Sequence, residues 1–425
     1  MKDFAKKRLL GFQNLVQVDL FYMARGSFWT TISFVMSSIF SLALIWAFGN
    51  LLSKETYGLY RYILSISGAI GFLTFSGLNT AVTQAVARGS DSILPYAVKV
   101  QAKWNQVYLL ASLVAAGYYW FQGNTTIAVG LAIIGALFPL TTAMNSYGSY
   151  LVGKKDFKTA AFYGMISNLL YSAAMIFTLF KTENILFIIA VYGISNFLLM
   201  LIFYRQTLKR IPTRVPTEKE KKELFHFGKH ISVTHIFSTI SQYVDKIVIF
   251  HFLGPVAMAV YGLAMAIPER IRGYTKNIGS LILPRLSEKD MREIIPAFYK
   301  RSFQCLFLGV AVSLLYIWGA PYIYRWFLPQ YLDSILYSQV ISLSFIFTIP
   351  GTYMGTVFNS QKLIKTIYLS SLTAHISKIV LLIIFGAFWG VWGVIIAMLG
   401  VYMLGLILNF FLWSREVKRF NSLRV

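Results

Sequence analysis

Apolar runs of about 20 residues recur along the whole length of this 425-residue chain. A helix needs about 20 apolar residues to cross a bilayer, and repeated runs of that length are typical of polytopic α-helical membrane proteins. The composition agrees: 57% of the residues are hydrophobic, 13% are charged and the mean hydropathy is +0.62. Soluble domains average about 25% charged residues. A membrane β-barrel is excluded, because its strands alternate apolar and polar side chains in segments of about 10 residues.

The runs predict an all-α polytopic membrane protein with about twelve transmembrane helices. The first apolar run is too long for a cleaved signal peptide, so we expect it to remain in the membrane. Before it, residues 9–24 could form a short amphipathic helix in the membrane interface. The predicted spans cover residues 27–48, 56–87, 105–121, 125–152, 159–180, 184–204, 231–253, 256–283, 303–323, 334–360, 366–388 and 391–413.

The net charge of +23 raises the question of a nucleic-acid partner. The basic residues, however, lie at the ends of apolar runs and do not cluster on a soluble domain. Of the 33 Lys and Arg residues outside the predicted spans, 30 fall on one side of the membrane. The positive-inside rule places that side in the cytoplasm, with both termini. We therefore expect no nucleic-acid partner, and we expect anionic membrane lipid to face most of these cations.

The two halves of the chain look like copies of each other. LLSKETYGLY (51–60) lies between the first two spans, and FLGPVAMAVY (252–261) lies between spans seven and eight, each ending in Tyr. Pro139 precedes Lys154 by the same 15 residues that separate Pro350 from Lys365. Because each half has an even number of spans, such copies would run parallel, as the repeats of some transporters do.

We therefore predict two pseudo-symmetric six-helix lobes around a central cavity. The N-terminal lobe covers residues 1–204 and the C-terminal lobe covers residues 230–425. Between them, residues 205–229 carry Pro212, Pro216 and the run EKEKKE, and this segment is interpreted as a solvated cytoplasmic linker.

Spans seven and eight, joined at Gly254-Pro255, carry six charged residues. A charge near the bilayer centre costs roughly 3 kcal/mol or more, so these side chains are hard to place against lipid. They are instead expected to face a polar, hydrated space inside the bundle. The six are Asp245, Lys246, Glu269, Arg270, Arg272 and Lys276.

Helical spacing indicates which side chains share this space. Thr234, Ser238, Ser241, Gln242 and Asp245 follow at steps of three and four, which predicts a polar face along span seven. Glu269, Arg272 and Lys276 share a face of span eight, next to Pro268, where the helix is expected to bend. One interpretation is an ion-pair cluster that only fixes packing. The other is an anion site, because four cations face two carboxylates in these two spans.

Two further cations and a histidine extend the candidate site. Lys378 lies midway along span eleven, with His375 one turn away on the same face. Arg61 lies near the outer end of span two, where it either joins the cavity or extends to the outer surface. In span one, Thr30, Ser33, Ser37, Ser38 and Ser41 either line the cavity or allow close helix packing.

Motifs of hydrolases, nucleotide-binding proteins and metalloproteases are absent, so the sequence predicts no enzyme and no cofactor. His226 and His230 are four residues apart but lack nearby Cys or carboxylate ligands other than Glu223, so we expect no metal site there. The single cysteine, Cys305, is expected to be a packed thiol.

The stretch from Gly26 to Gly89, GSFWTTISFVMSSIFSLALIWAFGNLLSKETYGLYRYILSISGAIGFLTFSGLNTAVTQAVARG, resembles the start of polysaccharide flippases of the Wzx type. VDKIVIFHFLGPVAMAVYGLAMAIPERIR is similar to their seventh and eighth spans, where an acidic and a basic residue precede a Leu-Gly(-Pro) turn. The resemblance extends over the whole chain. It implies the fold of the multidrug/oligosaccharidyl-lipid/polysaccharide exporter superfamily.

The resemblance also implies a function. Such proteins translocate undecaprenyl-pyrophosphate-linked O-antigen or capsule repeat units across the bacterial cytoplasmic (inner) membrane. A polysaccharide polymerase and a chain-length regulator are candidate partners. The expected anion-binding groups are Arg270, Arg272, Lys276, Lys378, Lys246 and Arg61, with Asp245, Glu269, Gln242 and His375 as polar or coupling groups. The alternatives are an ion-coupled multidrug extruder of the same fold and a non-transporting scaffold for envelope assembly.

Overall fold

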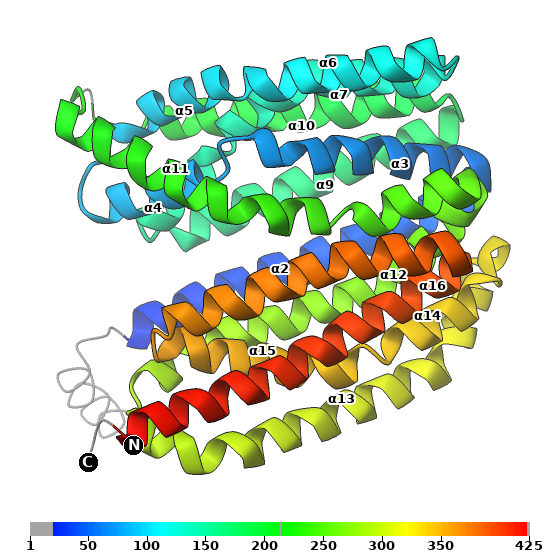
Figure 1. Cartoon of the computed structure of the whole chain (residues 1–425). Coiled ribbons are helices and arrows are strands. Elements are labelled where there is room, and N and C mark those ends of the chain that lie inside the picture. The colour runs from blue at the N-terminus through cyan, green and yellow to red at the C-terminus, as the bar shows by residue number, and fades with distance from the viewer. Residues whose placement is uncertain (1–19, 213, 423–425) are drawn as a thin grey trace, which may run out of the picture.

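In the computed structural model, residues 20–212 and 214–422 are described, and they fold into a bundle of long, roughly parallel and antiparallel helices (Figure 1). The predicted amphipathic segment before the first span lies mostly outside these residues. The helices are α2 Leu20–Leu51, α3 Lys54–Ile70, η1 Gly71–Leu73, α4 Leu78–Ala87, α5 Ile93–Trp104, α6 Gln106–Phe121, α7 Thr125–Met144, α8 Ser146–Gly153, α9 Phe157–Lys181, α10 Ile185–Leu208, α11 Glu218–Ser241, α12 Val244–Ser287, α13 Met291–Phe327, η2 Pro329–Tyr331, α14 Ser334–Ser342, α15 Phe345–Ser360 and α16 Ile364–Ser422.

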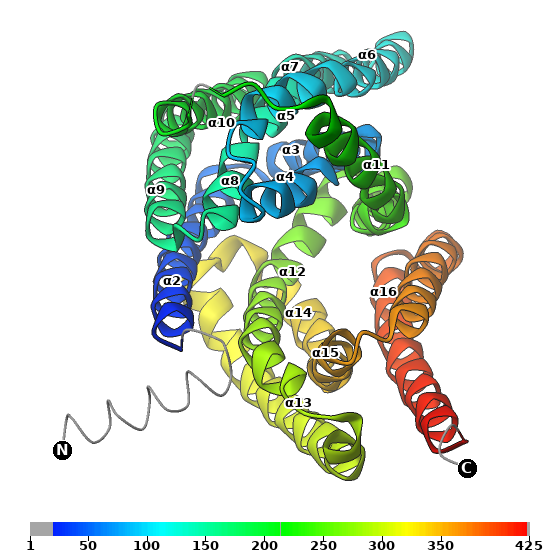
Figure 2. The same ribbon diagram turned by 90° about the vertical axis from the view of Figure 1, so that its left-hand side faces the viewer.

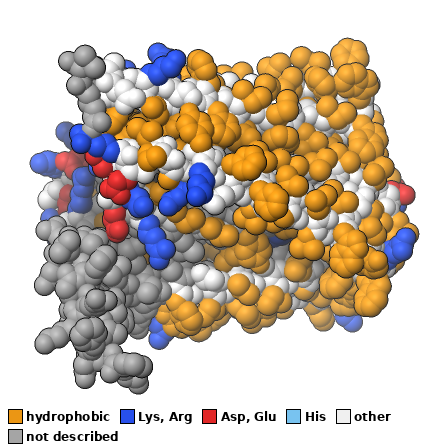
Figure 3. Space-filling model, turned by 90° about the horizontal axis from the view of Figure 1, so that it is seen from below, with side chains coloured by type: hydrophobic (Ala, Val, Ile, Leu, Met, Phe, Trp, Pro, Cys, Tyr) orange, Lys and Arg blue, Asp and Glu red, His pale blue; other side chains and the backbone are white. Residues whose placement is uncertain are grey.

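Eight helices within the described part of the chain are long and apolar enough to cross a membrane. A ninth is counted when α3 with η1 and α4 form one span, bent by 58° at their break. The chain is thus an all-helical, multi-pass membrane protein. Large hydrophobic side chains cover most of the face shown in Figure 3, and charged side chains gather towards one end. Both described chain ends and the α10–α11 connection lie at one end of the bundle, called here the linker end (Figure 1).

Two of the long helices reverse direction at a glycine with positive φ. Gly254 has φ 79° inside α12, and Gly390 has φ 58° inside α16. Across the first turn, the Tyr261 hydroxyl donates to Asp245 Oδ2 at 2.7 Å, which only antiparallel segments allow. The predicted turns at Gly254-Pro255 and within GAFWGVWG are therefore confirmed. Both lie at the end opposite the linker end (Figure 1).

The predicted second span, residues 56–87, is wrong as one continuous helix. The chain leaves the helix between Leu73 and Leu78, around Ser76-Gly77. Side chains from elsewhere bond the freed backbone groups: the Phe75 N–H donates to Asn105 Oδ1, and the Gly77 N–H donates to Ser232 Oγ. These long-range partners stabilise a break that helical periodicity does not reveal.

Parts of the predicted linker, residues 205–229, are helical. Helix α10 continues to Leu208, and α11 begins at Glu218, inside the EKEKKE run. Thr217 caps α11: its hydroxyl accepts from the Glu220 N–H, and the Glu220 carboxylate accepts from the Thr217 N–H. This capping box turns a charged run into the first turns of a helix.

Helix α11 packs against both halves of the chain. Near its start, Gly228 lies against Leu78 of α4, and Glu220 accepts a hydrogen bond from Ser90. At its end, Ser241 pairs with His375 of α16. Seen from the linker end, α11 stands beside α4 and across from α16 (Figure 2).

The two halves also meet where α3 packs along α12. Gly58 of α3 lies against the Pro255 carbonyl, and a Cβ at this glycine would fall 1.8 Å from that oxygen. Tyr62 stacks on Phe250, with ring centroids 3.5 Å apart. The interface between the halves is therefore tightly packed at the end opposite the linker end.

Candidate functional site

A cavity of about 700 Å³ lies in the second half, between the end of α11, both parts of α12, α15 and both parts of α16. Eight of the ten predicted site residues line it, although the sequence places them on three separate spans. The eight are Gln242, Asp245, Lys246, Glu269, Arg272, Lys276, His375 and Lys378. Four of these carry a positive charge and two carry a carboxylate.

Each of the two carboxylates of this cavity has one partner among the described side chains, and Asp245 Oδ1 has none. Asp245 is 2% exposed and accepts the hydrogen bond from Tyr261. Glu269 is half exposed, and its Oε1 lies 3.9 Å from Lys246 Nζ. Lys246 also lies over the Tyr243 ring, 5.6 Å from its centroid.

The remaining three cations form no ion pair with a described residue: Arg272, Lys276 and Lys378 have no such carboxylate within 4.0 Å. Arg272 donates to the Tyr402 hydroxyl and lies over that ring, 5.4 Å from its centroid. His375 Nδ1 is held at 2.7 Å from Ser241 Oγ. The cavity therefore keeps an excess of positive charge that no described side chain neutralises.

The other two predicted cations lie in an adjoining pocket of about 280 Å³, between α2, α3 and α12. This pocket shares Glu269 and Gly273 with the cavity. Arg61 lies against Gly262, and its Nε is buried without a hydrogen-bond partner among the described residues. Arg270 donates to Ser41 of α2. Arg61 thus faces this pocket and does not extend to the outer surface.

The polar face predicted along span seven is only partly in the cavity. Ser241, Gln242 and Asp245 line it, whereas Thr234 and Ser238 are exposed and bond carbonyls of their own helix. The chain turns at Gln242–Tyr243, between α11 and α12, so the residues before the turn do not continue the same face.

The serines of span one mostly support packing. Ser37 accepts from Asn168 of α9, Ser33 donates to Ala161, and Ser38 bonds the Phe34 carbonyl of its own helix. The side chain of Thr30 lies outside those described. Only Ser41 reaches a predicted cation.

Sequence reasoning missed several residues of the cavity. Tyr402 holds Arg272, and Asn409 Oδ1 accepts from Ser370 at 2.6 Å. Thr348 and Thr352 add hydroxyls from α15. Of these residues, only Asn409 could have been predicted from the sequence, because it is an amide within an otherwise apolar run.

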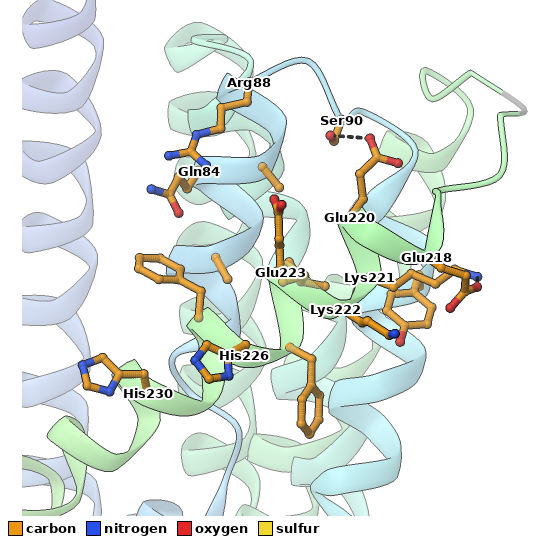
Figure 4. A pocket seen from close by; sticks show the side chains of 16 residues that line it. Gln84, Arg88, Ser90, Glu218, Glu220, Lys221, Lys222, Glu223, His226 and His230 are labelled. Carbon is orange, nitrogen blue, oxygen red and sulfur yellow. Dashed lines mark hydrogen bonds and ion pairs between the residues drawn. The ribbon is translucent and has the colours of Figure 1, made fainter.

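A larger groove, of about 1380 Å³, opens at the linker end between α4 and α11 (Figure 4). Its charges balance, because Arg88, Lys221 and Lys222 face Glu218, Glu220 and Glu223. Lys221 pairs with Glu218 at 2.7 Å, and Glu220 bonds Ser90. We therefore take the cavity with the cationic excess as the candidate site, although it is smaller.

His226 and His230 follow each other along this groove (Figure 4). No group of three or more His, Cys, Asp or Glu side chains within residues 20–212 and 214–422 is arranged to hold a metal ion.

Solved structures identify the class of fold. The chain aligns with an inward-facing multidrug resistance MATE family transporter of the MOP superfamily (TM-score 0.69, 16% identity, 91% of this chain and 95% of that chain). It aligns similarly with the lipid II flippase MurJ in an inward closed conformation (0.68, 14%, 91% and 87%). A third match is a MOP superfamily transporter from Pyrococcus furiosus, whose binding pocket is described as reversed in polarity (0.61, 16%, 95% and 96%). The chain therefore has the fold of these transporters.

The family follows from the sequence itself. Residues 23–290, more than half of the chain, match the family described as "Polysaccharide biosynthesis protein". The chain therefore belongs to the polysaccharide biosynthesis protein family. No curated protein matches it significantly.

Proposed function

We propose that the protein is a flippase for polyprenyl-pyrophosphate-linked oligosaccharide repeat units, of the O-antigen or capsule type. The observation that carries the proposal is the cationic excess of the cavity: Arg272, Lys276 and Lys378 lack a carboxylate partner among the described residues. Unpaired cations inside a membrane bundle are costly, and a bound anion would offset that cost. A lipid pyrophosphate supplies such an anion, which Arg binds through two hydrogen bonds and Lys as a point charge.

The rest of the cavity suits the sugar part of that substrate. Asn409, Ser370 and Gln242 offer amide and hydroxyl groups, and Tyr402 offers an aromatic ring. The polyprenyl tail would remain in lipid, between helices. A cationic drug would instead need a carboxylate-rich cavity, and here four cations outnumber the two carboxylates. A scaffold without transport would not need the unpaired cations.

The proposed mechanism is alternating access between two lobes, residues 1–204 and 230–425. Twelve passes result from the nine counted above, which include α3 with η1 and α4 as one span, if α12 and α16 each add a second pass and α6 adds one more. The reversals at Gly254 and Gly390 support the second passes. The close packing of Gly58 on Pro255 supports a state closed at the end opposite the linker end. With 30 basic residues on the linker side, we propose that this side is cytoplasmic and that the membrane is the bacterial inner membrane.

The test is surface-polysaccharide display in a flippase-deficient strain that carries single Gln replacements of Arg270, Arg272, Lys276 and Lys378, with protein amounts measured. We expect at least a tenfold loss of display for Arg272→Gln and Lys378→Gln, and partial activity for Arg272→Lys. Arg325→Gln is the matched control, because Arg325 is exposed near the opposite end of the bundle. Normal display by all four neutralised variants would show that the cationic-cavity mechanism is wrong.

A further inference from the structure

A separate pocket of about 520 Å³ lies at the end opposite the linker end, where the two halves meet. Its walls are the start of α3, the end of α6, the turn before α7 and the α12 segment around Gly254. Its volume lies within the range of small-molecule sites, about 300–1,000 Å³. The side chains that the argument uses are Glu55, Tyr62, Tyr118, Tyr119, Gln122 and Asn124.

One wall of this pocket is aromatic and fixed in place. The Tyr62 and Tyr119 hydroxyls are hydrogen-bonded at 2.6 Å, and Tyr62 stacks on Phe250 with an interplanar angle of 5°. Tyr118 packs edge-on against Tyr119 and is 58% exposed. The wall thus presents a rigid aromatic surface with one ring available to a ligand.

Two polar side chains that line the pocket, Gln122 and Asn124, have no hydrogen-bond partner among the described residues. Gly123, with φ 81°, makes the tight turn that places Gln122 and Asn124 on either side of it. Asn124 is the N-cap residue of α7, yet its side chain makes no capping hydrogen bond. Asn at this position usually accepts from the first turn of the helix. Its amide and that of Gln122 therefore remain available as donors and acceptors.

The charge of the pocket is the reverse of that of the cavity. Among the described residues that line it there is no Lys or Arg, His251 is the one basic side chain, and the one carboxylate, Glu55, forms no ion pair with a described residue. An anion such as pyrophosphate meets no Lys or Arg of the described residues there. Aromatic faces, amides, Thr hydroxyls and a single carboxylate together suit a neutral sugar, whose C–H face packs on a ring while its hydroxyls pair with the amides.

We propose that this pocket is a carbohydrate-binding site for neutral or N-acetylated sugars. Carbohydrate binding follows from the pocket alone. That the sugar belongs to the transported repeat unit rests on the proposed function, in which this interface would open to release the cargo. The sugars would then have a second site besides the cationic cavity, at the end opposite the linker end.

The full chain is purified into phosphatidylglycerol nanodiscs without maltoside detergent, so that no other sugar or choline is present. Saturation-transfer NMR is recorded with N-acetylglucosamine, with galactose and with choline. Two variants are compared, Gln122→Ala/Asn124→Ala and Tyr118→Leu, with folding checked by thermal unfolding. Phe121→Leu is the matched control, because Phe121 ends the same helix, is 91% exposed and does not line the pocket.

We expect saturation transfer to at least one sugar, at least a fivefold loss in both pocket variants and no change in the control. Transfer to neither sugar, equal transfer in all variants, or transfer to choline alone would overturn the proposal. Binding of inorganic pyrophosphate is measured on the same samples and is expected to be unchanged in both pocket variants. Failure of pyrophosphate to bind any sample would count against the proposed function alone.

Discussion

Two polar clusters lie inside this largely apolar bundle, and they differ in how well their groups are satisfied. The neutral network in the first half consists of Asn79, Gln101, Asn105 and Ser146, and the last three are at most 1% exposed. The cationic cavity in the second half contains Arg272, Lys276 and Lys378, which have no ion-pair partner among the described residues. A buried polar group that is fully bonded stabilises a fold, whereas one that is not bonded is available for a ligand.

The neutral network stabilises three interruptions of the helices at one place. Asn105 lies at the bend between α5 and α6, accepts from the Phe75 N–H in the α3–α4 break and donates to the Pro139 carbonyl in α7. Gln101 donates to the Phe75 carbonyl at 3.3 Å. Ser146 Oγ lies 2.7 Å from both Asn79 Oδ1 and Gln101 Oε1. The role of the neutral network is therefore to replace the backbone hydrogen bonds that are lost where the helices break.

The largest effect on stability is expected at the centre of this network. Asn105→Leu leaves the buried Phe75 N–H without an acceptor, which costs about 2 kcal/mol of unfolding free energy. Gln106→Leu is the matched control, since the neighbouring Gln106 is exposed and bonds only the Ala102 carbonyl of its own helix. Denaturant unfolding of the purified proteins measures both. Equal stability of the two variants would show that the network is not structural.

The opposite result is expected in the cavity. Lys378→Gln removes an unpaired cation, so the free energy of unfolding should stay the same or rise by up to about 1 kcal/mol, while polysaccharide display is lost. The same denaturant unfolding and display assays measure this pair of outcomes. A fall in the free energy of unfolding with normal polysaccharide display would show that Lys378 stabilises the fold. The cationic cavity would then not differ from the neutral network in this respect.

The smallest effect concerns a charged cluster that is satisfied. At the linker end, hydrogen bonds from Ser90 and Thr217 lower the pKa of the Glu220 carboxyl to about 2. An unfolded glutamate has a pKa near 4.3, so this carboxylate stabilises the start of α11 above about pH 4, and the stabilisation is lost as the pH falls towards 2.

A spin label at Val215, in a Cys305→Ser background, reports on this cap. The mobility of the label should be the same at pH 7 and pH 5 and should rise at pH 3. In Glu220→Gln it should already be high at pH 7. If the label became mobile between pH 7 and pH 5 in the protein that keeps Glu220, the lowered pKa of this carboxyl would be contradicted.

Helical periodicity was enough to predict much of the cavity. Glu269, Arg272 and Lys276 share a face because their spacing fixes it, and the same argument paired His375 with Lys378. Spacing also separated Arg270 from this face, and the structure places it in the adjoining pocket with Arg61. The turns at Gly254 and Gly390 could be predicted because glycine tolerates positive φ.

The rest depended on contacts between distant residues. Neither periodicity nor turn composition indicates that Asn105 and Ser232 stabilise the break near Phe75. Tyr402 is one of many tyrosines in apolar runs, and nothing in its local sequence marks it as the partner of Arg272. The cap at Thr217 was visible as a Thr three residues before Glu220, but the density of charge around it suggested a solvated linker.

The most direct test of the cationic cavity is binding of inorganic pyrophosphate to the protein in nanodiscs. Its dissociation constant is measured for the unsubstituted chain and for the variant Arg272→Gln/Lys276→Gln/Lys378→Gln at the same ionic strength. We predict saturable binding that weakens at least tenfold in the variant, with Arg325→Gln unchanged. Equal affinity in all three proteins, or no binding to any of them, would contradict an anion site in this cavity.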